Sequence, residues 1–229
     1  MLLFKRKWPV VMIILFAAAG ARAAETWPAR FDAVEDSLEA RIKFPETRGD
    51  GTIIIRCAAQ VSDSGKMEKH GCYGDNSGAD VFIAAINKAA KKARMQPAVI
   101  DGRPHAVYVQ YRVRFETRGD ENILTIYNNP GVLENIEAYG EDHIAAQRGL
   151  TKERWQSVCP QRLRFLVWVK AHVAHSGDQS SINIASNDGP PITQKCEEAI
   201  IATMKESSFT PALADGEPVP STFVEPFGS

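Results

Sequence analysis

The chain has 229 residues with 44% hydrophobic and 24% charged side chains, and its 27 Lys and Arg nearly balance its 28 Asp and Glu. This composition is that of an ordinary folded protein, which excludes a disordered tail, a collagen-like repeat and a multi-span membrane protein. The near-neutral charge also argues against nucleic-acid binding, which depends on the neutralisation of phosphates.

The first segment, residues 1–23, is typical of a secretory signal. Residues 5–7 are basic, residues 8–20 form an apolar run, and residues 21–23 read Ala-Arg-Ala, which resembles a cleavage site. The apolar run is short for a membrane-spanning helix, which needs about 20 residues. We therefore expect cleavage and a periplasmic location. The alternative is an uncleaved signal that anchors the chain in the inner membrane.

Four cysteines follow this segment, and an even number in an exported chain favours disulfides over metal or redox sites. Residues 52–61 have the pattern of a strand that carries Cys57, and Cys72 lies in the next strand at a position symmetric about a Ser-Gly turn. A hairpin places these two cysteines face to face, which leaves Cys159 to pair with Cys196. The cysteines lack zinc-ligand spacing, and we expect no metal and no cofactor.

The motif Pro-Ala-x-x-Asp-Gly-x-Pro occurs twice, within residues 95–104 and within residues 209–218. Each copy follows a strand, a Ser-Gly turn, a second strand, a Gly-rich loop and an amphipathic helix, and each precedes a further extended segment. This period is well beyond that of a solenoid repeat. The sequence therefore predicts an α+β fold of two tandem ββαβ domains, each with a small antiparallel sheet and one packed helix.

The predicted order along the chain is a signal peptide at 1–23, domain 1 at 24–118, a partly structured connector at 119–158, and a degenerate domain 2 at 159–229. A short helix is expected ahead of the first copy, where Phe31, Val34, Leu38 and Ile42 recur at helical spacing. The connector is expected to contain a strand at 123–127 and short helices around 132–139 and 152–158.

The third strand of the first copy, residues 107–115, alternates apolar and polar side chains, which predicts a half-buried strand. The corresponding segment of the second copy, residues 222–224, is short and flanked by Pro220 and Pro226. Because proline cannot donate to a central ladder, this segment is expected at a sheet edge or in a loop.

This order of elements, the repeated motif and the Phe44-Pro45 pair before the first strand resemble the carboxy-terminal domain of TonB-type energy transducers. The resemblance covers residues 44–116 well and residues 162–227 in a more degenerate form. It implies a periplasmic, non-catalytic module that takes up an extended peptide of an envelope protein as an added strand. By resemblance, the exposed edge strand comprises Val107, Tyr108, Val109, Gln110, Tyr111, Arg112 and Val113.

The sequence also allows other interpretations of this edge strand and of the function. The same edge can instead pair with the other repeat or with a second copy of the chain, since exposed edges are usually covered. The protein is then a structural or scaffold component of the cell envelope. A small hydrolase is less favoured, because the chain lacks the common nucleophile motifs. The 13 prolines are scattered rather than gathered in a spacer, so we expect binding rather than force transmission.

A basic run and a pair of histidines can each be interpreted either as ordinary structural features or as functional sites. Lys88, Lys91, Lys92 and Arg94 form a basic run that is usually a solvated helix face; contact with peptidoglycan or an anionic lipid surface is the functional alternative. His172 and His175 lie near the end of a strand, where alternation places them on opposite faces, so a shared metal is not expected.

Overall fold

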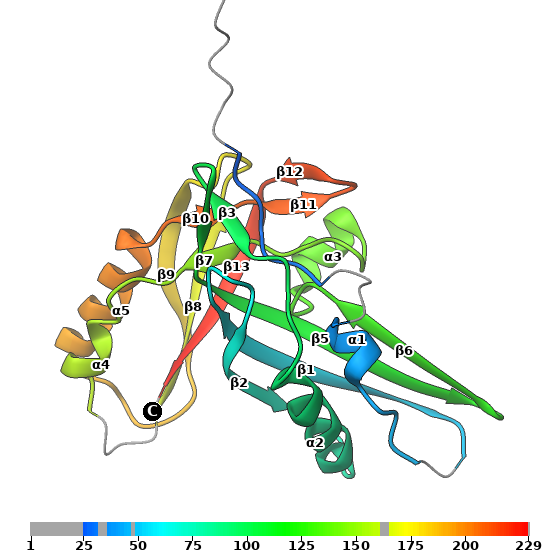
Figure 1. Ribbon diagram of the computed structural model, residues 1–229. Coiled ribbons are helices and arrows are strands. Elements are labelled where there is room, and N and C mark those ends of the chain that lie inside the picture. Colours follow the sequence, from blue (N-terminus) through cyan, green and yellow to red (C-terminus); the bar gives the residue numbers. More distant parts are fainter. Residues whose placement is uncertain (1–24, 32–35, 47–48, 161–164, 229) are drawn as a thin grey trace, which may run out of the picture.

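A computed structural model describes residues 25–31, 36–46, 49–160 and 165–228. The expected signal peptide at 1–23 lies outside these residues. The described part is a mixed α+β structure with small, antiparallel sheets and five helices (Figure 1). Among these helices, none has the length and apolar character needed to cross a membrane.

The larger sheet has six strands in the order β10-β7-β5-β1-β2, with β6 paired to part of β5. Its central pair, β5 and β1, is antiparallel along the whole of β1, from Gly51 opposite Thr117 to Val61 opposite Val107. The strands are β1 (Gly51–Val61), β2 (Met67–Tyr73), β5 (Val107–Arg118), β6 (Glu121–Tyr127), β7 (Gln147–Gly149) and β10 (Phe209–Thr210).

One helix, α2 (Ala79–Ala90), buries its apolar face against this sheet. Phe82 and Ile86 of the helix share a core with Tyr111 and Phe115 of β5, and Phe82 lies 4.8 Å from Phe115 between ring centroids. The apolar side chains that recur every three to four residues in the helix pack against those that alternate along the strand, as the sequence predicts.

The smaller sheet has three strands in the order β13-β8-β9. These are β8 (Leu166–Val173), β9 (Gln179–Asn187) and β13 (Ser221–Gly228), and α5 (Gln194–Glu206) packs on them through Cys196, Ile200 and Met204. The segment expected as a strand at 222–224 is longer than predicted, because β13 continues through Pro226 to Gly228. It lies at the edge of the sheet, as proline requires.

The two halves of the chain follow the same order of elements. β1, β2, α2 and β5 in the first half correspond to β8, β9, α5 and β13 in the second, and each repeated motif forms a small hairpin. These hairpins are β3 (Ala98–Ile100) with β4 (Arg103–His105), and β11 (Ala212–Ala214) with β12 (Glu217–Val219). Both turn at an Asp-Gly pair with two positive φ angles, which is the geometry that this dipeptide favours.

The structure requires glycine at the second position of each Ser-Gly turn. Gly65 and Gly177 have φ angles of 78° and 88°. A Cβ atom would lie 2.0 Å from the Met95 carbonyl oxygen at Gly65 and 2.6 Å from the Phe209 carbonyl oxygen at Gly177. Each turn therefore packs directly on the chain that leads into the repeated motif, and a side chain is excluded at both places.

The segment between the halves is structured along most of its length. It contains β6, α3 (Leu133–Tyr139), β7 and α4 (Trp155–Val158), close to the positions expected from the sequence. β6 extends the sheet of the first half, and the long β5–β6 hairpin projects from the molecule (Figure 1). The helix expected before the first copy is described only as α1 (Leu38–Arg41), because residues 32–35 lie outside the described part.

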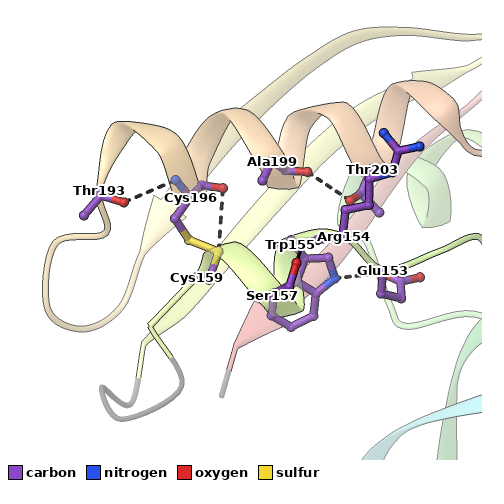
Figure 2. Close-up of a disulfide and its surroundings, with 9 residues drawn as sticks. All are labelled: Glu153, Arg154, Trp155, Ser157, Cys159, Thr193, Cys196, Ala199 and Thr203. Atoms are coloured by element: carbon purple, nitrogen blue, oxygen red, sulfur yellow. Dashed lines mark hydrogen bonds between the residues drawn. A yellow bond between two sulfur atoms is a disulfide. The ribbon is translucent and has the colours of Figure 1, made fainter.

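Both expected disulfides are present, and they join different kinds of elements. Cys57 and Cys72 face each other in register across β1 and β2. Cys159, which directly follows α4, is bonded to Cys196 on the first turn of α5 (Figure 2). In the same turn the Thr193 hydroxyl accepts a hydrogen bond from the Cys196 amide at 3.3 Å, which caps the helix.

We predict that removing each disulfide lowers the free energy of unfolding by an amount set by the loop that it closes. The sequence separations are 15 for Cys57–Cys72 and 37 for Cys159–Cys196. The chain-entropy relation gives about 3 and about 4 kcal/mol respectively. Paired Cys→Ala variants, compared by urea unfolding, test this order. A larger loss for the Cys57/Cys72 variant would contradict it.

Candidate functional site

The strand expected to offer a free edge is an interior strand. β5 pairs with β1 on one side, and on the other side Val107 and Tyr108 pair with β7 while Arg112 to Arg118 pair with β6. The prediction of an exposed edge is therefore wrong for Val107, Tyr108, Arg112 and Val113, which pair with β7 or β6. Val109, Gln110 and Tyr111 lie between these two pairings, and the side chains of Val109 and Tyr111 are buried. The physical reason is that the connector folds back and supplies two strands that pair with most of this edge.

The two faces of β5 have different neighbours. Val107, Val109, Tyr111 and Val113 are buried in the core beneath α2. On the opposite face, Tyr108 packs against the core of the second half, and the Gln110 side chain donates to the Val224 carbonyl at 2.5 Å. The polar face predicted from alternation is therefore an internal contact surface between the halves.

Arg112 is the buried charge on this face of β5. Its guanidinium donates to Glu141 at 2.5 Å and to the Asn129 side chain at 2.9 Å, and it lies over the Tyr127 ring. These partners all come from the connector, so Arg112 ties the connector to the sheet instead of contacting solvent.

The corresponding strand of the second half, β13, has a capped outer edge. The Asn135 side chain accepts from the Thr222 amide at 2.9 Å and donates to the Thr222 carbonyl at 2.8 Å. The next outward carbonyl, that of Val224, accepts from Gln110. Two residues further on, Pro226 has no amide hydrogen to donate. Side chains and a proline therefore close the edge that an added strand would need.

A buried ion pair lies where the two halves meet. Arg148 of β7 donates to both carboxylate oxygens of Glu225 of β13, at 2.7 Å each, and also to Glu153 at 3.0 Å and Ser207 at 3.2 Å. Both side chains of the main pair are almost completely buried. This bidentate geometry is the strongest form of an arginine–carboxylate contact.

The environment shifts the pKa of both partners. Burial raises the pKa of Glu225, and the Arg148 guanidinium opposes that shift. Burial alone would lower the pKa of Arg148, but Glu225 and Glu153 together raise it above its ordinary value. We assign the ionised form to both groups, because two short hydrogen bonds from a guanidinium require a carboxylate that accepts at both oxygens.

The sequence alone indicates only some of the residues that form these contacts between the halves. Glu225 occupies an inward position in the alternation of Phe223 and Phe227, and a carboxylate at an inward position signals a buried partner. Arg148 and Asn135 carry no comparable local signal. Their partners are 77 and 87 residues away along the chain.

The second strands of the two halves, β2 and β9, lie at the ends of their strand orders, and their outer edges have no paired strand in the described part of the chain. β2 carries Glu68, Lys69 and His70, and Lys69 has a positive φ of 43°. Charges and irregular backbone are the devices that natural edges use against added strands. β9 has two register shifts and a positive φ of 52° at Ser181, so its backbone is irregular as well, but its sequence, Gln-Ser-Ser-Ile-Asn-Ile-Ala-Ser-Asn, contains no charged residue and no proline. β9 is therefore the less protected edge.

His70 lies in a small polar cluster beside the first disulfide. Its Nδ1 donates to Asn87 at 2.9 Å, its Nε2 accepts from the Tyr111 hydroxyl at 2.5 Å, and the Cys72 sulfur is 3.6 Å from Nε2. Within the described residues, Cys57, His70 and Cys72 are the one group close enough together to hold a metal. Both sulfurs are used in the disulfide, so this group cannot supply a thiolate pair.

Comparisons of the chain with protein-family models, with curated proteins and with solved structures found no match.

We predict that Glu225→Gln lowers the free energy of unfolding by about 3–5 kcal/mol, since breaking a buried pair leaves a guanidinium without its main counter-charge. The matched control is Glu206→Gln, because Glu206 contacts Arg154 at the surface and its side chain is 52% exposed. The control should lose less than about 1 kcal/mol. Urea unfolding of both variants measures the difference, and equal losses would refute the importance of the pair.

We also predict that His70 and His143 each contribute a loss of stability as the pH falls from 7 to 5. Burial lowers the pKa of His70 and of His143, against the opposing effects of their Asn87 and Gly140 hydrogen bonds. A histidine with a lowered pKa in the folded state contributes stability above its unfolded pKa of about 6.5, and that stability is lost as the pH falls through the folded value.

Melting temperatures across this pH range test the prediction. His70→Gln should flatten the pH dependence, because it removes one of the two titrating groups. His105→Gln, at an exposed position, is the control and should leave the pH dependence as it is in the unsubstituted protein. If His70→Gln keeps the full slope, His70 is not a source of the effect.

Proposed function

We propose that the protein is an exported, non-catalytic binding module of the cell envelope, built from two TonB C-terminal-like ββαβ units. The common order of elements in the two halves, with strand orders β5-β1-β2 and β13-β8-β9, supports this proposal. Two disulfides suit an oxidising compartment such as the periplasm. The partner is an envelope protein that supplies an extended segment, which adds to a sheet as a strand.

The binding edge that we propose is the outer edge of β9. The observation that carries this proposal is that β9 ends its sheet with nine residues free of charge and proline, whereas the outer edges of β5 and β13 are occupied. An arriving strand would have to displace β6 and β7 to reach β5. At β9 it finds main-chain groups with no strand beyond them in the described part of the chain.

Strand alternation identifies which groups of β9 face outward. The Thr222 amide and carbonyl bind Asn135, so they point away from β8. In an antiparallel ladder, the residue opposite an outward-facing one points its main-chain groups to the other side. His172, opposite Thr222, and Lys170, opposite Val224, therefore point their main-chain groups toward β9. Lys170 pairs with Asn183. The main-chain groups of the residues on either side, Ile182 and Ile184, therefore face outward while their side chains pack against the core.

A second function is favoured by the closed edges themselves. Both third strands, β5 and β13, are satisfied within one chain. A protein whose edges are closed in this way fits a structural or scaffold role in the envelope, in which folded surfaces rather than a free strand edge make the contacts. The two functions differ in whether the outer amides of β9 become protected when a partner binds.

We predict that Asn183→Lys with Ala185→Lys abolishes partner binding, because charges on an edge strand oppose strand addition. Both side chains are exposed, so the fold should tolerate the change. The matched control, Asn76→Lys with Asn122→Lys, adds the same charge at exposed positions outside β9. The measurements are affinity capture from an envelope extract and hydrogen exchange of the purified complex.

The exchange experiment separates the two functions. Strand addition should slow exchange of the Ile182 and Ile184 amides in the complex, and the β9 variant should lose both the capture and the protection. Capture that survives in the β9 variant, without protection of these amides, would refute strand addition and favour the scaffold role.

A further inference from the structure

A groove lies between α1 with the segment that follows it and the outer side of α2. Its volume is about 700 Å³, which is within the range of sites that hold small molecules. We call it the α1–α2 groove and define it by its lining residues: Asp36, Ala40, Arg41, Lys43, Phe44, Pro45, Val81, Ala84, Ala85, Lys88, Ala89 and Lys92. It belongs to the first half of the chain, whereas β9 belongs to the second.

The floor of the groove is apolar and is made largely of small side chains. Ala84, Ala85 and Ala89 follow one stripe of α2, and Phe44 with Pro45 forms part of the opposite wall. Val81 lies at one end and is 55% exposed, so it adds apolar surface to the floor. Small side chains on a packed helix leave room for an apolar chain along the stripe.

The rim of the groove is cationic. Lys43, Lys88 and Lys92 line it, and in the described part of the chain none of them has an ion-pair or hydrogen-bond partner. The one carboxylate in the lining, Asp36, is bound by Arg41. The Nε atom of Arg41 is buried and lacks an acceptor among the described residues. Because this atom has almost no accessible surface, a ligand in the groove would contact other atoms of the rim cations.

The second half provides a comparison within the same molecule. Its helix α5 packs beside α4 as α2 packs beside α1, but Cys159–Cys196 joins that pair covalently. Alignment of the buried positions of the helices, with Phe82 opposite Cys196 and Ile86 opposite Ile200, places Ala202 and Glu206 where α2 has Lys88 and Lys92. The lysines are therefore a feature of the first half and not a requirement of the fold.

We propose that the α1–α2 groove binds a single-chain carboxylate amphipath of the fatty-acid type, with its acyl chain on the alanine stripe and its carboxylate among the rim cations. The lining contains only apolar and charged side chains and lacks the neutral hydrogen-bonding groups that read a peptide backbone. A ligand that suits it therefore needs one anionic end and an otherwise apolar body. Charge complementarity selects the carboxylate over an uncharged or cationic head.

Titration calorimetry of the full chain with monomeric laurate tests this assignment. Laurate should bind, and affinity should rise about fourfold for each added methylene from decanoate to laurate, as about 0.8 kcal/mol per buried CH₂ implies. Dodecanol and dodecyltrimethylammonium, which have the same chain without the negative charge, should bind at least tenfold more weakly. Binding of all three with similar affinity would overturn the proposal.

Three variants locate the site. Lys88→Glu with Lys92→Glu should weaken laurate binding at least tenfold, and Ala85→Trp should weaken it by filling the floor. The matched control, Lys195→Glu with Lys205→Glu, makes the same charge reversal on exposed positions of α5 and should change the affinity less than twofold. If Ala85→Trp fails to fold, the exposed lysine pair still decides the result.

Two other outcomes would overturn the proposal. The first is laurate binding that the Lys88/Lys92 reversal leaves unchanged, which would place the ligand elsewhere. The second is adsorption to phosphatidylglycerol vesicles without binding of monomeric laurate, which would make the lysines a membrane-contacting surface instead of a ligand site. None of these measurements depends on strand addition at β9, so this proposal and the proposed function can fail separately.

Discussion

Arg148 and Glu225 meet at the joint between the two halves, where β7 pairs with β5 and faces β13. Arg148 belongs to β7, a three-residue strand that pairs with β5 on one side and with β10 on the other. Its guanidinium reaches the carboxylate of β13. Since removing two charges from water costs about as much as their attraction returns, such a pair adds little net stability but strongly penalises any arrangement that separates it. The pair therefore determines how the second half sits on the first.

This joint decides which edges are left for a partner. With β7 held against β5, the outer side of β5 is completed by connector strands, and with β13 facing the first half its outward main chain is within reach of Asn135 and Gln110. Within the strand orders β5-β1-β2 and β13-β8-β9, the edges left without a paired strand in the described residues are those of the second strands, β2 and β9. Of these, only β2 carries the charged side chains that discourage pairing.

The local elements were predictable from the sequence, while their long-range partners were not. Alternation identified β5, and symmetry about a Ser-Gly turn identified the Cys57–Cys72 pair, because both signals lie within a few neighbouring residues. The edges of β5 depend on β6 and β7, and no residue of β5 specifies them. The length of β13 was underestimated because Pro226 interrupts the pattern; its missing amide faces the outer edge, where no ladder bond is lost.

The two halves share an order of elements but are cross-linked at different places, and this difference has a functional consequence. In the first half the disulfide lies in the sheet, between β1 and β2, and α1 is held beside α2 without a covalent bond, by packing and by a hydrogen bond from the Arg94 amide to the Asp36 carbonyl. In the second half the disulfide ties α4 to α5. A groove between two helices can admit a ligand only if the helices are not drawn together, and in the second half the disulfide holds α4 against α5. The first half meets that condition at α1–α2, while the second half retains the uncharged strand edge at β9. In our two proposals, the same order of elements therefore supplies a small-molecule site in one half and a peptide-binding edge in the other.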